Sequence, residues 1–349
     1  MKFLKEHWWK ILCVVCLIYV VIAGLITPLS PGIHKVEPSN LKVGANQDVL
    51  IKGYNTRFDG KAKPELWVEI GKDTICGRNI EVESEEKLRA DLFIPKGLSH
   101  KSIVLHLSSP QSGTYLLPDA FFIQEGSGNA GPEKKPQCQP TAYPGPESFS
   151  FPFRKILYES IRNLYFHVPM WFGMMGLMTL GFVFSILRLH RGDPKSDRYA
   201  LSFVEVGTVL ALLGLATGSI WARFTWTTWW VWDPKLNGAA VTTLIYLAYL
   251  VLRNSIRDPE QRGRVAAVYN IFAFVLLIVF LLILPRVAPN SLHPGAGGNP
   301  AFSRYDLDNS MRTVFYPAVI GWFLLGLWIA RLRIRSRRIL EVLKRSEQL

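Results

Sequence analysis

Six apolar runs of membrane-spanning length constrain this chain more than any other feature of its sequence. They cover residues 8–26, 168–187, 199–220, 236–252, 265–284 and 313–330. A transmembrane helix needs about 20 predominantly apolar residues, and one large soluble core would not gather its apolar residues into such runs. Only 19% of the residues are charged, while 49% are hydrophobic. The sequence therefore predicts an all-α polytopic membrane bundle of six transmembrane helices.

The formal net charge of +13 would suit nucleic-acid binding in a soluble protein, so its distribution matters. Most of the excess Lys and Arg lies in residues 1–10, 188–198, 253–264 and 331–349, which alternate with the apolar runs on one side. Short segments rich in Lys and Arg stay cytoplasmic. We therefore expect both termini to be cytoplasmic, with residues 336–349 as a basic tail, and we expect no nucleic-acid partner.

The first apolar run, within residues 1–27, allows two interpretations. A basic start, an apolar middle and the small residues Ala23 and Gly24 also fit a cleaved signal peptide. An apolar length of about 18 residues is long for a signal peptide and favours a retained first transmembrane helix.

Residues 28–127 have a different pattern, in which Pro, Gly and Asn separate short alternating stretches. Five stretches fit strands of an all-β sandwich, at 48–52, 66–70, 80–83, 88–94 and 103–107. The patterns VEPSNLKVGANQDVLIKGYN and GTYLLPDAFFI resemble the immunoglobulin-like TIG/IPT module, which implies an inserted extracytoplasmic binding or spacer domain. Residues 128–153, rich in Gly, Pro, Ser and Lys, predict a flexible linker. A disulfide between Cys76 and Cys138 is an open alternative.

The stretch WARFTWTTWWVWD, residues 221–233, is the most unusual part of the chain. It holds five of the 11 tryptophans: Trp221, Trp226, Trp229, Trp230 and Trp232. Tryptophan favours the membrane–water boundary, but ordinary aromatic belts scatter a few such residues over all boundaries. We interpret the loop 221–235 as a platform for a planar aromatic ligand. Asp233 and Pro234 predict the start of the next helix, as N-cap and first helical residue, so Asp233 also orients this platform.

Two histidines flank the tryptophan loop at the same predicted membrane face. His167 lies just before the second apolar run, and His293 is the only histidine between the fifth and sixth runs. Either histidine alone is more often an interfacial or surface residue than a ligand. Together with the tryptophans they fit a heme, whose iron accepts an imidazole on each side. The basic residues near this face are candidate partners for the heme propionates: Arg223, Lys235, Arg286, Arg304 and Arg312.

The segment TWTTWWVWDPKL resembles the tryptophan-rich WWD signature of heme-handling proteins of cytochrome c maturation. With NLYFHVP before it and SLHPGAG after it, the order is similar to the CcmC family, over residues 1–27 and 154–335. The resemblance implies a five-helix heme-handling region at 154–335. In that region His167 and His293 would be the axial ligands of heme b. The platform would consist of Trp226, Trp229, Trp230, Trp232 and Asp233, with Trp221 beside them.

The resemblance also implies partners and a location. It implies heme delivery to a CcmE-like heme chaperone, together with a CcmA-, CcmB- and CcmD-like ABC-type complex. The site would face the periplasm from a bacterial inner membrane. Two departures from the family pattern stand out: Thr227 replaces the usual Gly after the first signature Trp, and the β-domain is an insertion. A β-branched residue at that position predicts a different local turn.

Two other function classes compete with heme delivery. A CcsA-type cytochrome c synthetase shares the signature and joins heme covalently to apocytochrome, and the WDPK wording favours it. Such proteins resemble longer bundles with histidines inside the spans, whereas no predicted span here contains a histidine. A protein that acts through its β-domain, with the tryptophan loop as a membrane anchor, is the third class. We therefore expect heme binding and delivery, without catalytic residues.

Overall fold

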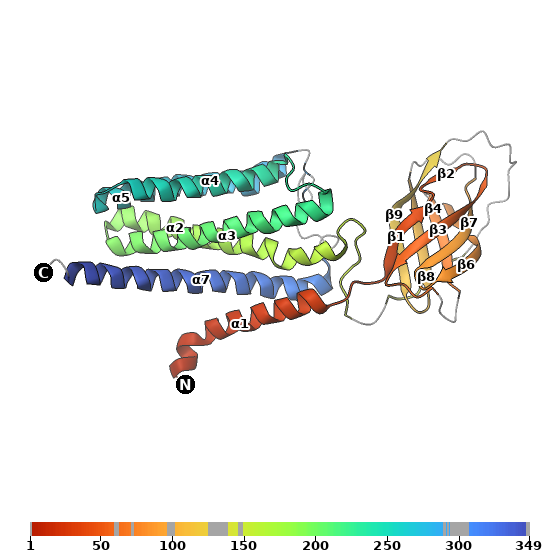
Figure 1. Cartoon of the computed structure of the whole chain (residues 1–349), viewed down its shortest axis with the longest axis horizontal. Helices are drawn as coiled ribbons and strands as arrows, with labels where there is room; N and C mark the ends of the chain where they lie inside the picture. Colours follow the sequence, from red (N-terminus) through yellow and green to blue (C-terminus); the bar gives the residue numbers. More distant parts are fainter. Residues whose placement is uncertain are drawn as a thin grey trace. The chain divides into compact units, whose positions relative to one another are not determined.

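The computed structural model describes residues 2–58, 63–70, 73–95, 102–124, 139–145, 149–288, 291, 293 and 307–346. The chain divides into two compact units. One unit is Thr27–Tyr158, and the other combines Met1–Ile26 with Glu159–Leu349. Strands make up the first and helices the second (Figure 1). The chain is thus a membrane bundle with an additional β unit, as its apolar and alternating patterns predict.

Six helices of the described chain have the length and apolar composition to cross a membrane, as predicted. They are α1 (Lys2–Ile26), α2 (His167–Arg191), α3 (Pro194–Trp226), α4 (Pro234–Ser255), α5 (Pro259–Ile278) and α7 (Asn309–Ser346). A 3-10 turn, η1 (Tyr158–Tyr165), precedes α2. A π-helical turn, η2 (Val279–Ile283), and the short α6 (Leu284–Val287) continue α5.

Three of these helices begin with the same two-residue capping motif. α3, α4 and α5 each have proline in the first turn after an aspartate whose side chain accepts a backbone N–H: Asp193, Asp233 and Asp258. Proline suits that position because the first N–H groups of a helix have no partner within the helix, and the aspartate satisfies one of those that remain. The predicted helix start at Asp233 and Pro234 is confirmed.

The helices pack around α2 and α3. α2 contacts α3, α5 and α7, and α1 lies along α7 (Figure 1). Met174, Leu177 and Met178 of α2 are fully buried in the core that these helices share. Gly207 of α3 lets Met178 approach, because a Cβ there would lie 2.9 Å from the Met178 methyl. Small residues at such contacts bring helices close together, which favours association in lipid.

Two helices are longer than the sequence predicts. α3 continues to Trp226, so the loop expected at 221–235 is reduced to residues 227–233. Residues 221–226 contain no Gly or Pro, and the helix ends only where Thr227 takes a left-handed backbone, with φ 62°. α7 likewise continues through Ser346, so the described part of the predicted basic tail is helical.

The β unit consists of two sheets. The first has the order β1 (Gly32–Glu37), β3 (Asn46–Tyr54), β7 (Lys87–Phe93) and β6 (Arg78–Ser84), all antiparallel. The second has the order β2 (Asn40–Lys42), β9 (Gly113–Gln124), β8 (Ser102–Ser109), β4 (Glu65–Ile70) and β5 (Asp73–Cys76). β2 pairs with β9 in parallel. Each of the five predicted strands lies largely or wholly within a strand, namely β3, β4, β6, β7 and β8.

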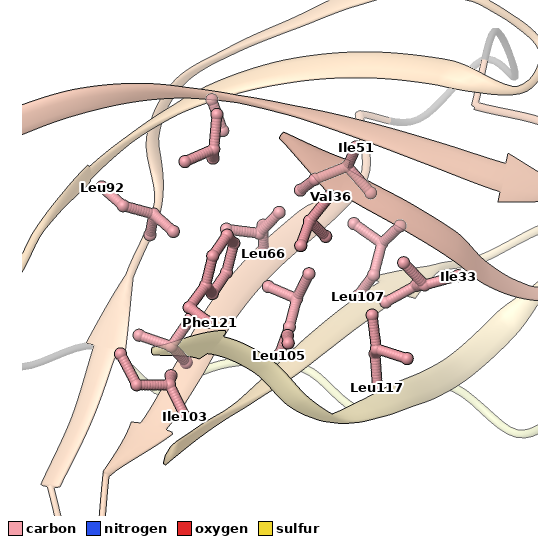
Figure 2. Close-up of a cluster of buried hydrophobic side chains, with 14 of the residues drawn as sticks. Ile33, Val36, Ile51, Leu66, Leu92, Ile103, Leu105, Leu107, Leu117 and Phe121 are labelled. Carbon is pink, nitrogen blue, oxygen red and sulfur yellow. The ribbon is translucent and has the colours of Figure 1, made fainter. Parts of the chain in front are cut away.

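The two sheets share one apolar core. Ile51 comes from the first sheet, while Leu66, Leu105 and Phe121 come from the second, and all are at most 2% exposed. Figure 2 shows these side chains directed toward one another between the strands. Alternate residues of each strand supply this core, because successive side chains of a strand point to opposite faces.

Part of the predicted flexible linker belongs to the β unit. The Tyr143 backbone N–H donates to Thr114 Oγ1 at 2.9 Å, and the Phe151 N–H donates to the Pro28 carbonyl at 2.9 Å. Phe151 is fully buried. Cys76 is in a disulfide, and Cys13 and Cys16 carry free thiols. Cys138, the partner considered for Cys76, lies outside the described residues.

Candidate functional site

A cavity of about 360 Å³ lies at the end of the helical unit where α2 and α4 begin and α3 ends. Residues of α2, α3, α4, η2 and α6 line it, together with Trp230 and His293. Cavities of this size hold small organic ligands. Part of the predicted platform, namely Trp221, Trp226 and Trp230, and both predicted ligand histidines therefore line one space.

The α2 wall begins with His167, the first residue of the helix. Its Nδ1 lies 3.1 Å from Thr217 Oγ1 on α3. One turn further along α2, the ring of Trp171 lies edge-on to the imidazole, with 6.4 Å between centroids. Phe172 and Met175 complete this wall, so the imidazole lies at the end of a largely apolar face.

The α3 wall combines two glycines with two tryptophans. A Cβ at Gly214 would lie 2.8 Å from the Trp171 ring, and a Cβ at Gly218 would lie 2.7 Å from His167 Cε1. Both glycines thus let α2 side chains lie against the α3 backbone. Trp221 and Trp226 follow in the next turns, with their rings edge to face at 5.0 Å.

The remaining walls come from the connection after α3 and from the end of α5. Trp230 is held by a short turn in which its N–H donates to Thr228 Oγ1 at 3.2 Å. Lys235, in the first turn of α4, lines the cavity beside it. The π-helical turn contributes Leu281 and Leu282, and α6 contributes Pro285 and Arg286. Single π-helical turns are frequent at functional sites.

His293 lies on the side of the cavity where Trp221 is. The two ring centroids are 6.0 Å apart and the rings are tilted by 50°. The His293 backbone N–H donates to Ser291 Oγ at 3.2 Å. His167 and His293 thus reach one cavity from segments more than 100 residues apart, with Lys235 and Arg286 as its basic side chains.

Seven of the predicted site residues line the cavity. They are His167, His293, Trp221, Trp226, Trp230, Lys235 and Arg286.

Two predicted platform tryptophans, Trp229 and Trp232, point elsewhere: they are 60% and 90% exposed and are not part of the lining. Asp233 is only 4% exposed and accepts the Lys235 N–H at 2.9 Å, so its position is that of a helix cap beside the cavity. Arg312 is near the start of α7, outside the lining. Arg304 lies outside the described residues.

Arg223, another predicted propionate partner, is engaged at the end of α3. Its guanidinium donates to the Thr227 carbonyl. Thr227 is the residue that replaces the usual glycine of the signature, and its φ of 62° is in the left-handed region. A β-branched residue is strained there. The departure in sequence therefore falls on a position where glycine would be free of strain, and the Arg223 contact stabilises the unusual cap.

Among the lining residues outside the predicted site set, Trp171, Gly214 and Gly218 shape the space around His167. Trp171 lies one turn after His167, so helical spacing places both side chains on one face of α2. Gly214 and Gly218 have the same spacing on α3. In the sequence, the signal was two large rings four residues apart in one helix and two glycines four residues apart in the next. That these rings lie against these glycines becomes visible only when the two helices are packed together.

The lining supports one kind of chemistry. Four indoles, including that of Trp171, offer apolar aromatic faces. Two imidazoles offer nitrogen donors, and two cations offer partners for acidic groups. Imidazole nitrogen is an axial donor for porphyrin iron, and basic side chains bind carboxylates by charge-assisted hydrogen bonds. The donor set therefore fits a flat, metal-containing ligand with carboxylate substituents.

Known proteins match the same part of the chain. A family model described as heme exporter protein C (CcmC) matches residues 154–348. Heme exporter protein C of Paracoccus denitrificans (strain Pd 1222) is 28% identical over 196 residues, which is 54% of this chain and 79% of that protein. Its counterpart in Escherichia coli (strain K12) is 26% identical over 183 residues, 51% of this chain and 70% of that protein. The matched range contains the whole cavity but neither α1 nor the β unit up to residue 153.

Proposed function

Because the chain belongs to the heme exporter protein C (CcmC) family, we propose that it binds heme in this cavity and delivers it during cytochrome c maturation. The observation that carries the proposal is the meeting of His167, His293 and the indoles around one space. The relatives compared above are named heme exporter protein C, which supports the same cargo here.

In this proposal His167 and His293 are the axial ligands of heme b. They approach from α2 and from the segment between α6 and α7, so ligation joins two segments that are distant in sequence. Two imidazoles occupy both axial positions of heme iron, which leaves no open position for oxygen. Heme is the cargo in this scheme, and the protein's task is to hold it and release it intact.

The indoles that line the cavity form the proposed platform. Trp221, Trp226 and Trp230 come from the signature, and Trp171 adds a fourth ring from α2. Aromatic faces stack on a porphyrin without fixing one contact, which suits a transient cargo. Lys235 and Arg286 are the proposed propionate partners because they are basic residues of the lining. Asp233 acts on the platform by holding the start of α4.

The proposed receiver is a CcmE-like heme chaperone, with a CcmA-, CcmB- and CcmD-like ABC-type complex as the surrounding assembly. The chain is a multi-pass membrane protein, and we place the cavity on the periplasmic side of the bacterial inner membrane. The distribution of Lys and Arg supports this orientation, since the excess lies near the opposite ends of the helices. The proposed activity is binding and transfer of heme, without covalent attachment of the porphyrin to any protein.

The ligand assignment is tested with protein purified from heme-replete cells. We expect a six-coordinate, bis-histidine absorption spectrum. His167→Ala and His293→Ala should each lower the heme content at least about tenfold, the scale on which coordination-shell changes act. His190→Ala is the matched control, because His190 is exposed near the other end of α2. Unchanged heme content and spectrum in both alanine variants would contradict the assignment.

A second experiment separates delivery from covalent synthesis. The protein is co-expressed with an apocytochrome c, with and without a CcmE-like chaperone. We expect no covalent cytochrome without the chaperone, and heme transfer to the chaperone when it is present. Covalent cytochrome formed without any chaperone would instead favour a CcsA-type synthetase.

A further inference from the structure

The hydroxyl of Thr217 lies between His167 and the backbone of α3. Its Oγ1 is 3.1 Å from His167 Nδ1, 2.9 Å from the Leu213 carbonyl and 3.1 Å from the Gly214 carbonyl. A threonine hydroxyl has one proton to donate and lone pairs to accept with. The two carbonyls can only accept, so they share the hydroxyl proton, and the lone pairs of the hydroxyl oxygen are left to accept from the imidazole.

We propose that Thr217 is a positioning residue that fixes the tautomer of His167. Because the hydroxyl proton is committed to α3, Nδ1 carries a proton and donates it to Thr217 Oγ1. The other nitrogen, Nε2, then holds the lone pair that a metal ion needs. This inference deepens the proposed function and rests on it, since it concerns how the imidazole is prepared for heme iron.

The packing around the ring supports this role. A Cβ at Gly218 would lie 2.7 Å from His167 Cε1, so the imidazole lies directly against the α3 backbone, one residue after Thr217. Asn163 Nδ2, just before α2, donates to the Thr217 carbonyl at 3.3 Å. The same turn of α3 thus holds the ring by a hydrogen bond, limits its rotation by contact and secures the segment that leads into α2.

A hydrogen bond to the second nitrogen is a general device for orienting a ligand histidine. It selects the tautomer, fixes the ring plane and raises the basicity of the coordinating nitrogen. Loss of such a partner typically lowers metal affinity about 10- to 100-fold. A hydroxyl that is itself anchored on a helix offers this bond without introducing a second charge into an apolar end of the bundle.

The first test uses the heme-free full-length protein with ¹⁵N-labelled histidine. Two-bond ¹H–¹⁵N NMR correlations distinguish the two neutral tautomers, and His167→Gln identifies the His167 signal among the seven histidines. We expect the Nδ1–H form in the wild type. Thr217→Val, which replaces the hydroxyl by a methyl of similar size, should give a mixture of tautomers, and Thr217→Ser should restore the Nδ1–H form.

Thr208→Val is the matched control for helix effects. Thr208 is on the same helix, is buried and donates to the Val204 carbonyl at 2.8 Å. Its substitution should leave the His167 signal unchanged. An Nε2–H wild type, or a Thr217→Val signal identical to the wild type, would overturn the inference.

The second test measures heme binding by titration of the same variants. Thr217→Val should weaken binding about 10- to 100-fold, with recovery in Thr217→Ser. Equal affinity in the wild type and Thr217→Val would also overturn the inference. A wild type that binds no heme at all would instead refute the proposed function, and the tautomer of the heme-free protein would still be read independently.

Discussion

The two ends of the helical bundle are built from opposite kinds of side chain. At the end where α2 finishes and α3 begins, ion pairs join neighbouring helices. Arg253 of α4 donates to Asp197 of α3 at 2.8 Å, and Arg188 of α2 pairs with Glu260 of α5. At the other end the helices are separated by a cavity lined by tryptophans and histidines.

A carboxylate that lies within a predicted span is also paired at this end. Glu205, within the third apolar run, pairs with Arg333 at 3.0 Å and with Arg337, both on α7. Its position is therefore explained by a contact between helices. Arg188 and Arg253 are nearly buried, at 2% and 7% exposure, so these pairs fix the helices to one another.

The comparison of the two ends shows how one bundle can be held together firmly and still contain a cavity for a ligand. Buried charges are costly unless paired, so the paired end holds the helices in register. At the other end, aromatic side chains and glycines leave a cavity whose lining includes two cations, Lys235 and Arg286. We expect substitutions at the cavity end to change ligand binding, and substitutions at the paired end to change stability.

Gly218→Leu should have the largest effect on binding. A side chain at this position would displace the His167 ring, because even a Cβ would lie 2.7 Å from Cε1. Overpacking of about 1–3 kcal/mol corresponds to a loss in heme affinity of about 5- to 150-fold. The loss is measured as a lower heme content of the purified protein. Ala216→Leu, at an exposed position of the same helix, is the control and should bind heme normally.

Arg253→Met should affect stability more than binding. It removes the partner of Asp197, which is itself only 20% exposed, and we expect a loss of about 2–3 kcal/mol. Thermal unfolding in detergent measures this loss, and the heme content of the folded fraction should stay the same. Arg264→Ala is the control, since Arg264 is 71% exposed and its pair contributes about 1 kcal/mol or less. If Arg253→Met lost heme without losing stability, the assignment of stability to the paired end and of binding to the cavity end would be wrong.

Asp193→Ala should have the smallest effect, and one that depends on pH. Asp193 caps α3 between two spans, and hydrogen bonds from the backbone N–H and hydroxyl of Ser196 hold the pKa of its carboxyl below the usual range. Loss of such a cap costs about 1 kcal/mol.

The contribution of this cap is present above the ordinary carboxyl pKa of about 3.9 and is lost as the pH falls through the lowered folded value. The stability difference between wild type and Asp193→Ala should therefore be full at pH 7 and shrink in acid. Asp193→Asn, which keeps an acceptor oxygen, should retain most of the cap without this dependence. Thermal unfolding of all three proteins at pH 7 and in acid measures these stabilities. A stability difference between wild type and Asp193→Ala that grows in acid would contradict the role assigned to Asp193.

The β unit differs from both ends of the bundle, because a densely packed apolar core fills the space between its sheets. Ile51, Leu105 and Phe121 are fully buried against one another between two sheets (Figure 2). The family match begins at residue 154, close to the end of this unit, and includes none of its strands. A partner of the β unit therefore has to be sought with the β unit itself, separately from the cavity.

Local sequence predicted the elements well where one physical rule dominates. Apolar length predicted the six spans, and alternation predicted the strands β3, β4 and β8. Asp233 and Pro234 predicted a helix start because capping depends only on adjacent residues. The end of α3 was placed too early, since tryptophan density was interpreted as a loop although nothing in residues 221–226 breaks a helix.

Length, periodicity and residue type are local properties, and they suffice to predict that this chain crosses a membrane, carries a β unit and gathers tryptophans in one segment. The packing of the helices decided which tryptophans face the cavity and which, like Trp232, face outward. It also decided that Gly218 and Thr217 lie against His167. Those relations depend on how α2 and α3 are rotated and paired, and the packing of the whole bundle sets that rotation.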